Sequence, residues 1–267
     1  MPAVGAVSPA TPLARSAGRG DRQPKAMRIL LIADVHANWE ALLSLQRAEP
    51  QPDAVLFAGD AVGYGPDPAN CVRWLRTQTT DAVRGDCDDA LVNGNGPHDL
   101  PSLDEAACAT LALARAQLTP ADRAALSLWP LTASLHLGGA MFVLAHATPA
   151  HPLDGTLDLL TASDATLSEA LGGHRADFVV LGHTHIPALR RANGTLFINP
   201  GSLGQPRYGV PDATYAVWND GQVQIKHLHY DHDATAQRLR LAPLSPEVIE
   251  QLTGVLESGL VDAQARS

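Results

Sequence analysis

The chain has 267 residues, 45% of them hydrophobic, which is enough for one large domain with a substantial core. Its formal net charge is −9, although residues 1 to 28 contain five arginine or lysine residues against one acid, Asp21. The remaining body is strongly acidic and would repel a phosphate backbone, which argues against binding of duplex nucleic acid through basic patches.

The first 26 residues are rich in small residues, proline and arginine. They contain no apolar run of signal-peptide length, and no later stretch approaches the length of a membrane span. We predict that these residues are a disordered tail, or a non-native extension before a true start at Met27. A transit peptide is the less favoured alternative. Residues 27–267 are predicted to form a single domain. Three cysteines at spacings typical of neither a disulfide framework nor a zinc ribbon indicate a cytoplasmic protein.

Three buried strands are predicted in the first third of the domain. The runs RILLIAD (28–34), DAVLFAGD (53–60) and DAVRGD (81–86) are apolar and each ends in an acid. Helices are expected between them, from the cap residue Asn38 to about Glu49 and from Ala69 to Thr77. Strands that alternate with helices predict a layered α/β sheet whose site lies at the carboxyl ends of the strands.

Residues 102–127 are predicted to be helical, with a second helix start at Thr119-Pro120, and to lie within an insertion at about 90–130. After this insertion the pattern of strands and helices continues. Paired strands are expected around Gly138-Gly139, the second being MFVLAH, followed by a helix near 156–171. DFVVLGHTH and LFINPGS predict two further strands, TYAVWNDGQVQIKHLHY a hairpin on its Asp-Gly turn, and 246–258 a final helix.

Potential metal ligands follow five of these strands: Asp34, His36, Asp60, Asp86, His146, His183 and His185. Seven oxygen and nitrogen ligands suffice for two metal ions with ~4 to 6 ligands each if one carboxylate is shared. Within DVH and HTH the two side chains are two residues apart, so just beyond a strand both can turn toward one point. We therefore expect two divalent ions, Mn²⁺ before Fe, Ni, Zn or Mg.

The ordered set DVH, GD, a GN(H)D-like segment, a histidine after a strand and GHTH resembles the calcineurin-like metallophosphoesterases. The resemblance runs from about Arg28 to Tyr230. GDAVGYGPDPANCVRWLR and INPGSLGQPRYG are similar to the small bacterial and archaeal phosphodiesterase branch. The resemblance to this family implies a four-layer α/β/β/α sandwich around a dinuclear metal centre. One metal would be held by Asp34, His36, Asp60 and His185, and a second, bridged by Asp60, by Asp86, His146 and His183.

Two residues depart from the family's Gly-Asn-His-(Asp/Glu) motif: Asp86 stands for the asparagine and Cys87 for the histidine that protonates the leaving group. Asp86 adds a negative charge to the second metal site, which repels anionic substrates. A thiol is a poorer proton donor near neutral pH than an imidazole. Cys87 is either a metal partner, a redox brake or a small residue packed beneath the loop, the last being favoured. Asp88 and Asp89 are expected to cap the next helix.

Arg207 lies in the loop after LFINPGS together with Asn199, Ser202 and Gln205. In the resembled branch this loop sits beside the metals, so Arg207 is a candidate phosphate clamp, with a surface arginine in a turn as the alternative.

The predicted function is a dinuclear metal-dependent phosphodiesterase in which a hydroxide that bridges the metals attacks the phosphate ester. Its substrate would be a small-molecule phosphate ester or a nucleotide. The predicted catalytic residues are Asp60, Asp86, Cys87 and Arg207. A phosphomonoesterase or a nucleotide pyrophosphatase on the same site, and a metal-poor scaffold of the same fold, remain alternatives. The sequence does not indicate an oligomeric state.

Overall fold

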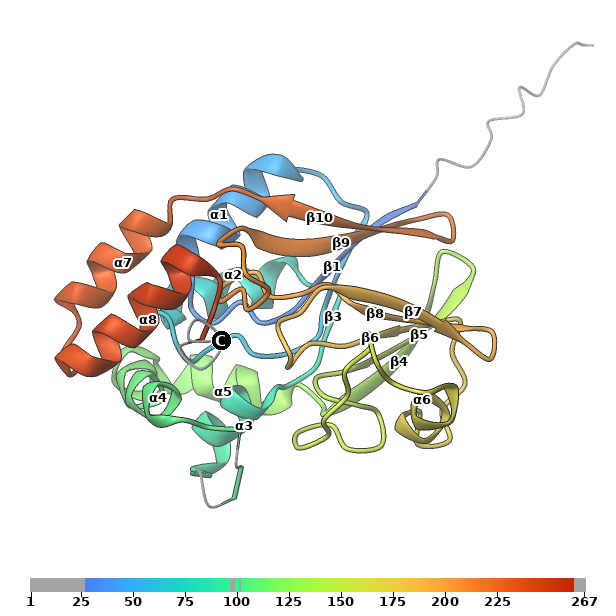
Figure 1. The fold of residues 1–267 in the computed structure, drawn as a ribbon, viewed down its shortest axis with the longest axis horizontal. Coiled ribbons are helices and arrows are strands. Elements are labelled where there is room, and N and C mark those ends of the chain that lie inside the picture. The colour runs from blue at the N-terminus through green and yellow to red at the C-terminus, as the bar shows by residue number, and fades with distance from the viewer. Residues whose placement is uncertain (1–26, 97–98, 101, 262–267) are drawn as a thin grey trace, which may run out of the picture.

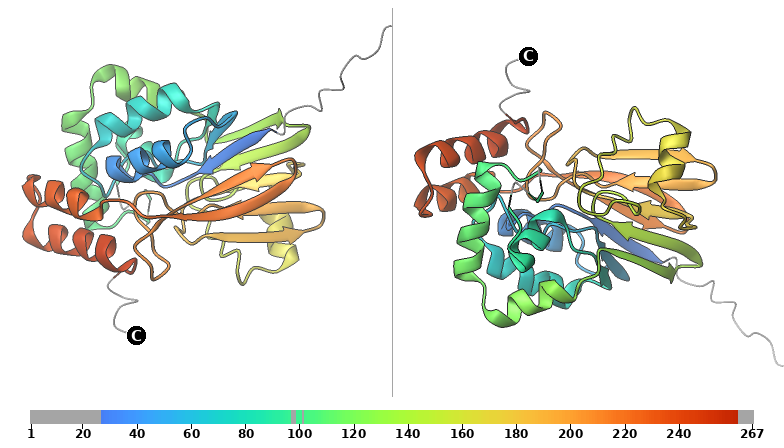
Figure 2. Two further views of the ribbon diagram at one scale, coloured as in Figure 1. Left: turned by 90° about the horizontal axis from the view of Figure 1, so that it is seen from above. Right: turned by 90° about the horizontal axis from the view of Figure 1, so that it is seen from below.

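The computed structural model describes residues 27–96, 99–100 and 102–261 and contains two five-stranded sheets packed face to face (Figures 1 and 2). The first has the order β10-β9-β1-β2-β3, with β1 (Arg28–Ile32), β2 (Ala54–Phe57), β3 (Asp81–Ala82), β9 (Ala213–Asn219) and β10 (Gln222–Leu228). The second has the order β4-β5-β6-β8-β7, with β4 (Thr132–Leu137), β5 (Ala140–Ala145), β6 (Phe178–Val180), β7 (Ala188–Ala192) and β8 (Thr195–Asn199).

Alternation along β1 explains why the sheets stack. Ile29 and Leu31 point into the space between the sheets, where they join a buried cluster with Phe142 and Trp218. Leu30 and Ile32 point to the other face and pack under the helices. Successive side chains of a strand alternate between faces, so a continuous apolar run can be buried on both sides.

Helices cover the outer faces of both sheets. α1 (Trp39–Ala48) and α2 (Pro68–Gln78) lie on the first sheet, and α6 (Asp164–Ala170) lies on the second (Figure 2). The remaining helices gather at one end of the sandwich: α3 (Asp86–Asn93), α4 (Glu105–Gln117), α5 (Pro120–Leu128), α7 (His232–Leu241) and α8 (Pro246–Ser258). The predicted four-layer α/β/β/α sandwich is therefore confirmed.

Two predicted helix starts agree with the structure in detail. The Asn38 side chain accepts a hydrogen bond from the Ala41 N–H, and Thr119 forms a capping box with Asp122 at the start of α5. Both predicted hairpins have the predicted turns, at Gly138-Gly139 and at Asp220-Gly221.

Several elements differ from the sequence-based prediction. The helix expected near 156–171 is confined to α6, and the third strand has only the two residues of β3. β7 and α7 were not predicted, although Asn193-Gly194 closes the β7–β8 hairpin and Asp231 caps α7.

Some predictions stay untested. The predicted tail at 1–26 lies outside the described residues, and the status of 90–130 as an insertion stays a prediction. None of the helices formed by the described residues is both long and apolar enough to cross a membrane.

Candidate metal centre

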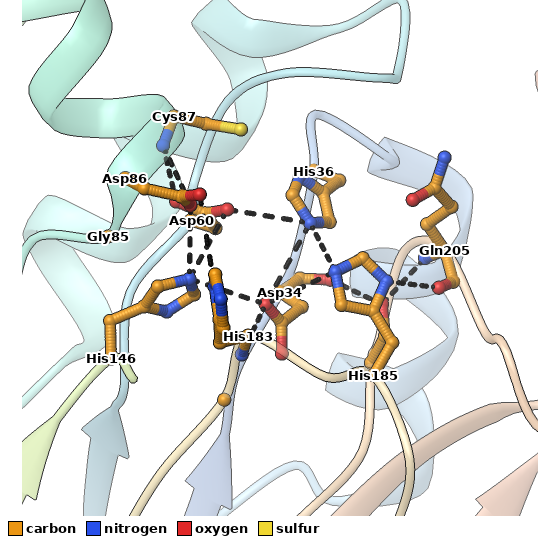
Figure 3. A network of polar contacts seen from close by, with 12 residues as sticks. Asp34, His36, Asp60, Gly85, Asp86, Cys87, His146, His183, His185 and Gln205 are labelled. Carbon is orange, nitrogen blue, oxygen red and sulfur yellow. Dashed lines mark hydrogen bonds and ion pairs between the residues drawn. The ribbon is translucent and has the colours of Figure 1, made fainter. Parts of the chain in front are cut away.

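The seven predicted ligands come together where the carboxyl ends of both sheets meet (Figure 3). Asp34 and His36 follow β1, Asp60 follows β2, and Asp86 begins α3 four residues after the end of β3. His146 follows β5, and His183 and His185 follow β6. Parallel pairing of β1, β2 and β3, and of β5 and β6, places these ends at one edge of each sheet.

Five of the seven residues have left-handed backbone conformations, with φ of 51° at Asp34, 45° at His36, 63° at Asp60, 70° at His183 and 60° at His185. Such conformations are unfavourable for residues with a side chain and concentrate at functional sites. Backbone hydrogen bonds hold them, including Asp34 N–H to Gly59 O (2.9 Å) and His36 N–H to Asp60 O (3.0 Å). The left-handed turns aim the side chains inward from the strand ends.

Asp34, His36, Asp60 and His185 form a first cluster. His36 Nε2 lies 3.8 Å from Asp34 Oδ1, 3.7 Å from Asp60 Oδ2 and 3.0 Å from His185 Nε2. His185 Nε2 lies 3.5 Å from Asp34 Oδ1. All four side chains are almost fully buried.

Asp60, Asp86, His146 and His183 form a second cluster. His146 Nε2 lies 3.4 Å from Asp60 Oδ2 and 3.3 Å from Asp86 Oδ1, and His183 Nδ1 lies 3.8 Å from Asp86 Oδ2. Because Asp60 belongs to both clusters, its carboxylate stands between them.

Backbone carbonyls determine which imidazole nitrogens face the centre. Nδ1 of His36 contacts Val62 O at 3.0 Å, Nδ1 of His146 contacts Ala58 O at 2.8 Å, and Nδ1 of His185 contacts Gln205 O at 2.6 Å. A carbonyl oxygen can only accept, so each Nδ1 carries hydrogen and the Nε2 of a neutral ring presents a lone pair. This is the arrangement that orients histidine for metal binding.

The protonation equilibria reflect a buried and crowded site. Burial raises the pKa of Asp34 to about 7 and that of Asp60 well above its usual range. Burial, together with the charge of Arg207, lowers the pKa of His36 to about 3 and that of His185 well below its usual range, so both rings are neutral. Burial opposes ionisation of Asp86, yet His146 and His183 hold its pKa well below the usual range.

The donor set of these residues fits divalent cations. Two neutral imidazoles whose Nε2 lone pairs face each other at 3.0 Å repel unless a cation lies between them and the carboxylates. Asp34 Oδ2 is buried and has no hydrogen-bond partner among the described residues. Buried groups of this kind are costly without a partner, and carboxylate oxygen with imidazole nitrogen is a typical donor set for first-row divalent metals.

The calcineurin-like phosphoesterase superfamily domain matches residues 27–220, a span that contains every predicted ligand. The chain belongs to this superfamily. The membership predicted from its motifs is therefore confirmed.

Relatives of this phosphoesterase cover most of its length. It is 26% identical over 222 residues to the uncharacterized protein MJ0912 of Methanocaldococcus jannaschii, a match that spans 77% of this chain and 88% of that protein. The crystal structure of a metallophosphoesterase from Sphaerobacter thermophilus is similar with a TM-score of 0.71 and 28% identity, over 85% of this chain and 98% of that one. The hypothetical protein PH1004 of Pyrococcus horikoshii shares the fold, with a TM-score of 0.75, 20% identity and coverage of 87% and 98%.

A cavity of about 690 Å³ opens over the metal centre of the phosphoesterase. Four acids contribute to its lining, namely Asp60, Asp86, Asp99 and Asp154, and Arg207 is the only lysine or arginine among the described lining residues. Nε and Nη2 of Arg207 donate to Gln205 Oε1 at 3.2 and 2.6 Å, and its guanidinium carbon lies 5.1 Å from the centre of the Tyr64 ring. Arg207 is thus held at the cavity and is not a free surface arginine.

The loop that carries Arg207 also supports the ligands. Asn199 Nδ2 donates to Gly182 O (2.7 Å) at the start of the GHTH segment, and Ser202 Oγ donates to Asp34 O (2.8 Å). These contacts place all four residues predicted for this loop beside the centre.

Cys87 packs as a small buried residue. Its side chain is 2% exposed, and a Cβ added at Gly63 would lie 2.9 Å from its sulfur. Burial and the charges of Asp60, Asp86 and Asp88 raise the pKa of the thiol well above its usual range, which argues against a reactive thiolate. Its backbone N–H donates to Asp60 Oδ1 and Asp86 Oδ1, both at 3.0 Å. A catalytic role for its side chain stays a prediction.

Among the lining residues that were not predicted, two contact predicted site residues directly. Tyr64 stands in the glycine-rich loop after Asp60, with φ of 59°, and contacts both Arg207 and His36. Ser102 donates a hydrogen bond to Asp86 Oδ2 from the segment between α3 and α4, 16 residues further along the chain. The glycine-rich loop could have drawn attention to Tyr64, whereas no sequence signal marks Ser102.

The predicted capping role is confirmed for Asp88 and wrong for Asp89, whose side chain bonds to Arg84, Asn93 and Asn95 instead. Both lie inside the first turn of α3, because this helix begins at Asp86. Asp89 pairs with Arg84 at 2.8 Å. Asp88 does accept from the Gly85 N–H as a cap, but it also binds the loop that carries Asp60.

Proposed function

We propose that this phosphoesterase is a dinuclear metal-dependent phosphodiesterase. The observation that carries the proposal is that Asp60 Oδ2 lies near both His36 of the first cluster and His146 of the second, at a cavity whose described lining has one arginine. When bound, two divalent cations supply Lewis-acid polarisation of the phosphoryl group and an activated water near neutral pH. Mn²⁺ is the proposed metal.

The chain's own residues would position the substrate. Gln205 Oε1 accepts from Nε and Nη2 of Arg207, and the guanidinium lies over the Tyr64 ring, so the group is held in place before substrate arrives. The Nη1–Nη2 end of the guanidinium would then donate to a phosphate oxygen. The left-handed turns fix the ligand side chains, so little rearrangement is needed on binding.

The charge of the cavity supports a diester. A phosphodiester carries one negative charge, whereas a monoester or a polyphosphate carries more. One arginine faces four acids among the described lining residues, and one of these acids, Asp86, replaces the neutral asparagine of the family motif. Each additional charge on a substrate therefore meets more repulsion here than in a site with the asparagine.

The nucleotide pyrophosphatase alternative has weaker support. Tyr64 is the only phenylalanine, tyrosine or tryptophan among the described lining residues, and its ring already contacts Arg207 and His36. Little aromatic surface remains on which a base could stack. This favours a small, polar phosphodiester over a nucleotide.

A metal-poor scaffold of the same fold is the alternative from another class. Three buried ligand carboxylates without a compensating cation are costly, and a scaffold has no need of them. Metal content after gentle purification separates the two: about two ions per chain supports the enzyme, and no metal supports the scaffold.

The activity test compares bis-p-nitrophenyl phosphate with p-nitrophenyl phosphate on chelator-stripped protein before and after Mn²⁺ is restored. Faster metal-dependent cleavage of the diester supports the proposal. Faster cleavage of the monoester would instead establish the phosphomonoesterase alternative, and cleavage that is independent of metal would refute the metal-dependent reaction.

A further inference from the structure

Asp88 is a fully buried carboxylate beside the metal centre that belongs to neither ligand cluster. It accepts four backbone hydrogen bonds. Oδ2 accepts from the N–H of Asp60 at 2.9 Å and of Gly85 at 3.2 Å. Oδ1 accepts from the N–H of Ala61 at 2.9 Å and of Val62 at 3.2 Å. One side chain thus joins the loop after β2 to the loop before α3.

Only a carboxylate can accept all four of these backbone hydrogen bonds. An ionised aspartate offers two oxygens and about four lone-pair sites with no hydrogen of its own. Asparagine has the same shape, but its amide group would present hydrogens to two of the four N–H groups. A serine hydroxyl is too short to reach both loops. The residue type therefore follows from the four donors that surround it.

The two loops that Asp88 joins carry ligands of both clusters. Asp60 is the shared carboxylate and has a left-handed backbone with φ of 63°. Gly85 directly precedes Asp86, and a Cβ added there would lie 2.0 Å from Asp60 Oδ1 and 2.6 Å from Asp60 N. The backbone of Gly85 is thus packed against the Asp60 carboxylate. A small movement of either loop would therefore change the distance between the carboxylate oxygens of Asp60 and Asp86.

We propose that Asp88 is a positioning residue that sets the geometry between the shared ligand Asp60 and the second-cluster ligand Asp86. The proposal rests on the proposed function, because it concerns how two cations are held. It predicts that loss of the Asp88 carboxylate disturbs the metal pair while the rest of the fold persists.

The test compares wild type with Asp88→Asn and with a matched control, Asp89→Asn. Asp89 lies next to Asp88 in the same helical turn and is also buried, but it pairs with Arg84, Asn93 and Asn95 and not with the loop of Asp60. Three quantities are measured: Mn²⁺ bound per chain, the Mn²⁺–Mn²⁺ coupling seen by electron paramagnetic resonance, and kcat and KM for bis-p-nitrophenyl phosphate. Circular dichroism reports folding.

Asp88→Asn is expected to weaken binding of at least one Mn²⁺ by roughly 10- to 100-fold and to alter the coupling signal. At saturating metal, kcat should fall while KM changes little, because Arg207 is untouched. Asp89→Asn should keep the wild-type metal content and coupling. Wild-type metal binding and coupling in folded Asp88→Asn would overturn the positioning role but leave the proposed function intact. A wild type without bound Mn²⁺ would instead refute the proposed function.

If Asp88→Asn does not fold, amide hydrogen exchange of the wild type tests the positioning role of Asp88 instead. The N–H groups of Asp60, Ala61, Val62 and Gly85 should exchange slowly both with Mn²⁺ and after its removal, because the Asp88 carboxylate holds them without metal. Rapid exchange of these four amides in the metal-free protein would overturn the proposal.

Discussion

The imidazoles of His36 and His185 face each other through Nε2 at 3.0 Å, while each Nδ1 contacts a backbone carbonyl. The rings are neutral because burial lowers the pKa of both, so the two lone pairs repel without a cation. We therefore expect the stability of the protein to depend on bound metal.

Removal of metal should lower the thermal unfolding temperature. A ligand present at 100 times its Kd stabilises a protein by about 2.7 kcal/mol, which for a domain of this size corresponds to roughly 5 to 10 °C. Chelator-treated protein should unfold that much earlier and recover when Mn²⁺ is restored. Equal unfolding temperatures in calorimetry, with and without Mn²⁺, would contradict a metal site at these histidines.

Asp60→Asn should abolish binding of both cations and metal-dependent turnover, because Asp60 is the carboxylate common to both clusters. Elemental analysis and diester hydrolysis measure the two effects. Asp220→Asn is the control, since it makes the same change at an exposed hairpin turn where asparagine also adopts the observed left-handed conformation. Retained turnover in Asp60→Asn would remove Asp60 from the catalytic site.

Arg207→Ala should raise KM for the diester by roughly 10- to 100-fold, the effect of a lost hydrogen bond to a charged group. Arg207→Lys should recover only part of this, because lysine keeps the charge but lacks the planar fork. Steady-state kinetics gives the comparison, with Arg190→Ala, an arginine of β7 paired with Asp164, as the control. An unchanged KM in Arg207→Ala would mean that Arg207 does not bind phosphate.

The double variant Asp86→Asn, Cys87→His restores the family motif and should increase monoester hydrolysis. The asparagine removes a negative charge, and the histidine supplies a proton donor for the leaving group. General acid catalysis contributes roughly 10²- to 10⁴-fold, and it matters most for poor leaving groups. The gain should therefore be larger for glycerol phosphate than for p-nitrophenyl phosphate.

The two single variants separate the effects of charge and of the proton donor. Circular dichroism must accompany the kinetics, because Cys87 is buried against Gly63. A folded double variant with no gain on either monoester would refute the leaving-group argument.

Glu49 should stabilise the fold in a pH-dependent way. Burial opposes its ionisation, but hydrogen bonds from Arg28, Tyr215 and Lys226 lower its pKa. A carboxyl whose pKa is lower in the folded than in the unfolded protein stabilises the fold at pH values above its unfolded pKa of about 4.3. This stabilisation is lost as the pH falls through the folded pKa.

Glu49→Gln should accordingly lower the free energy of unfolding by about 1 to 3 kcal/mol at pH 7, and the difference from wild type should shrink below about pH 4.3. Urea unfolding at both pH values tests this, with the exposed Glu169→Gln expected within about 0.5 kcal/mol of wild type. A difference that grows on acidification would contradict the assigned direction.

Much of the site was predictable because its ligands follow buried strands. The apolar runs before Asp34, Asp60 and His146 determine strands by local composition, and parallel strands bring their carboxyl ends to one edge. The weaker predictions concern segments with few apolar residues. β7 contains Ala-Leu-Arg-Arg-Ala at a sheet edge, and α7 carries a single buried leucine, Leu239, so neither has a clear periodic pattern.

The sequence by itself determined the fold class, the family and the seven candidate ligands, because each depends on short local patterns in a fixed order. Only the tertiary structure decided which nitrogen of His36 and His185 faces the centre, and that Asp88 joins the loops of Asp60 and Asp86. These features depend on contacts of side chains with backbone groups, most of them distant in sequence. The hydrophobic pattern of the sequence determines where strands form, whereas the packing of the loops against one another determines how the site residues are oriented.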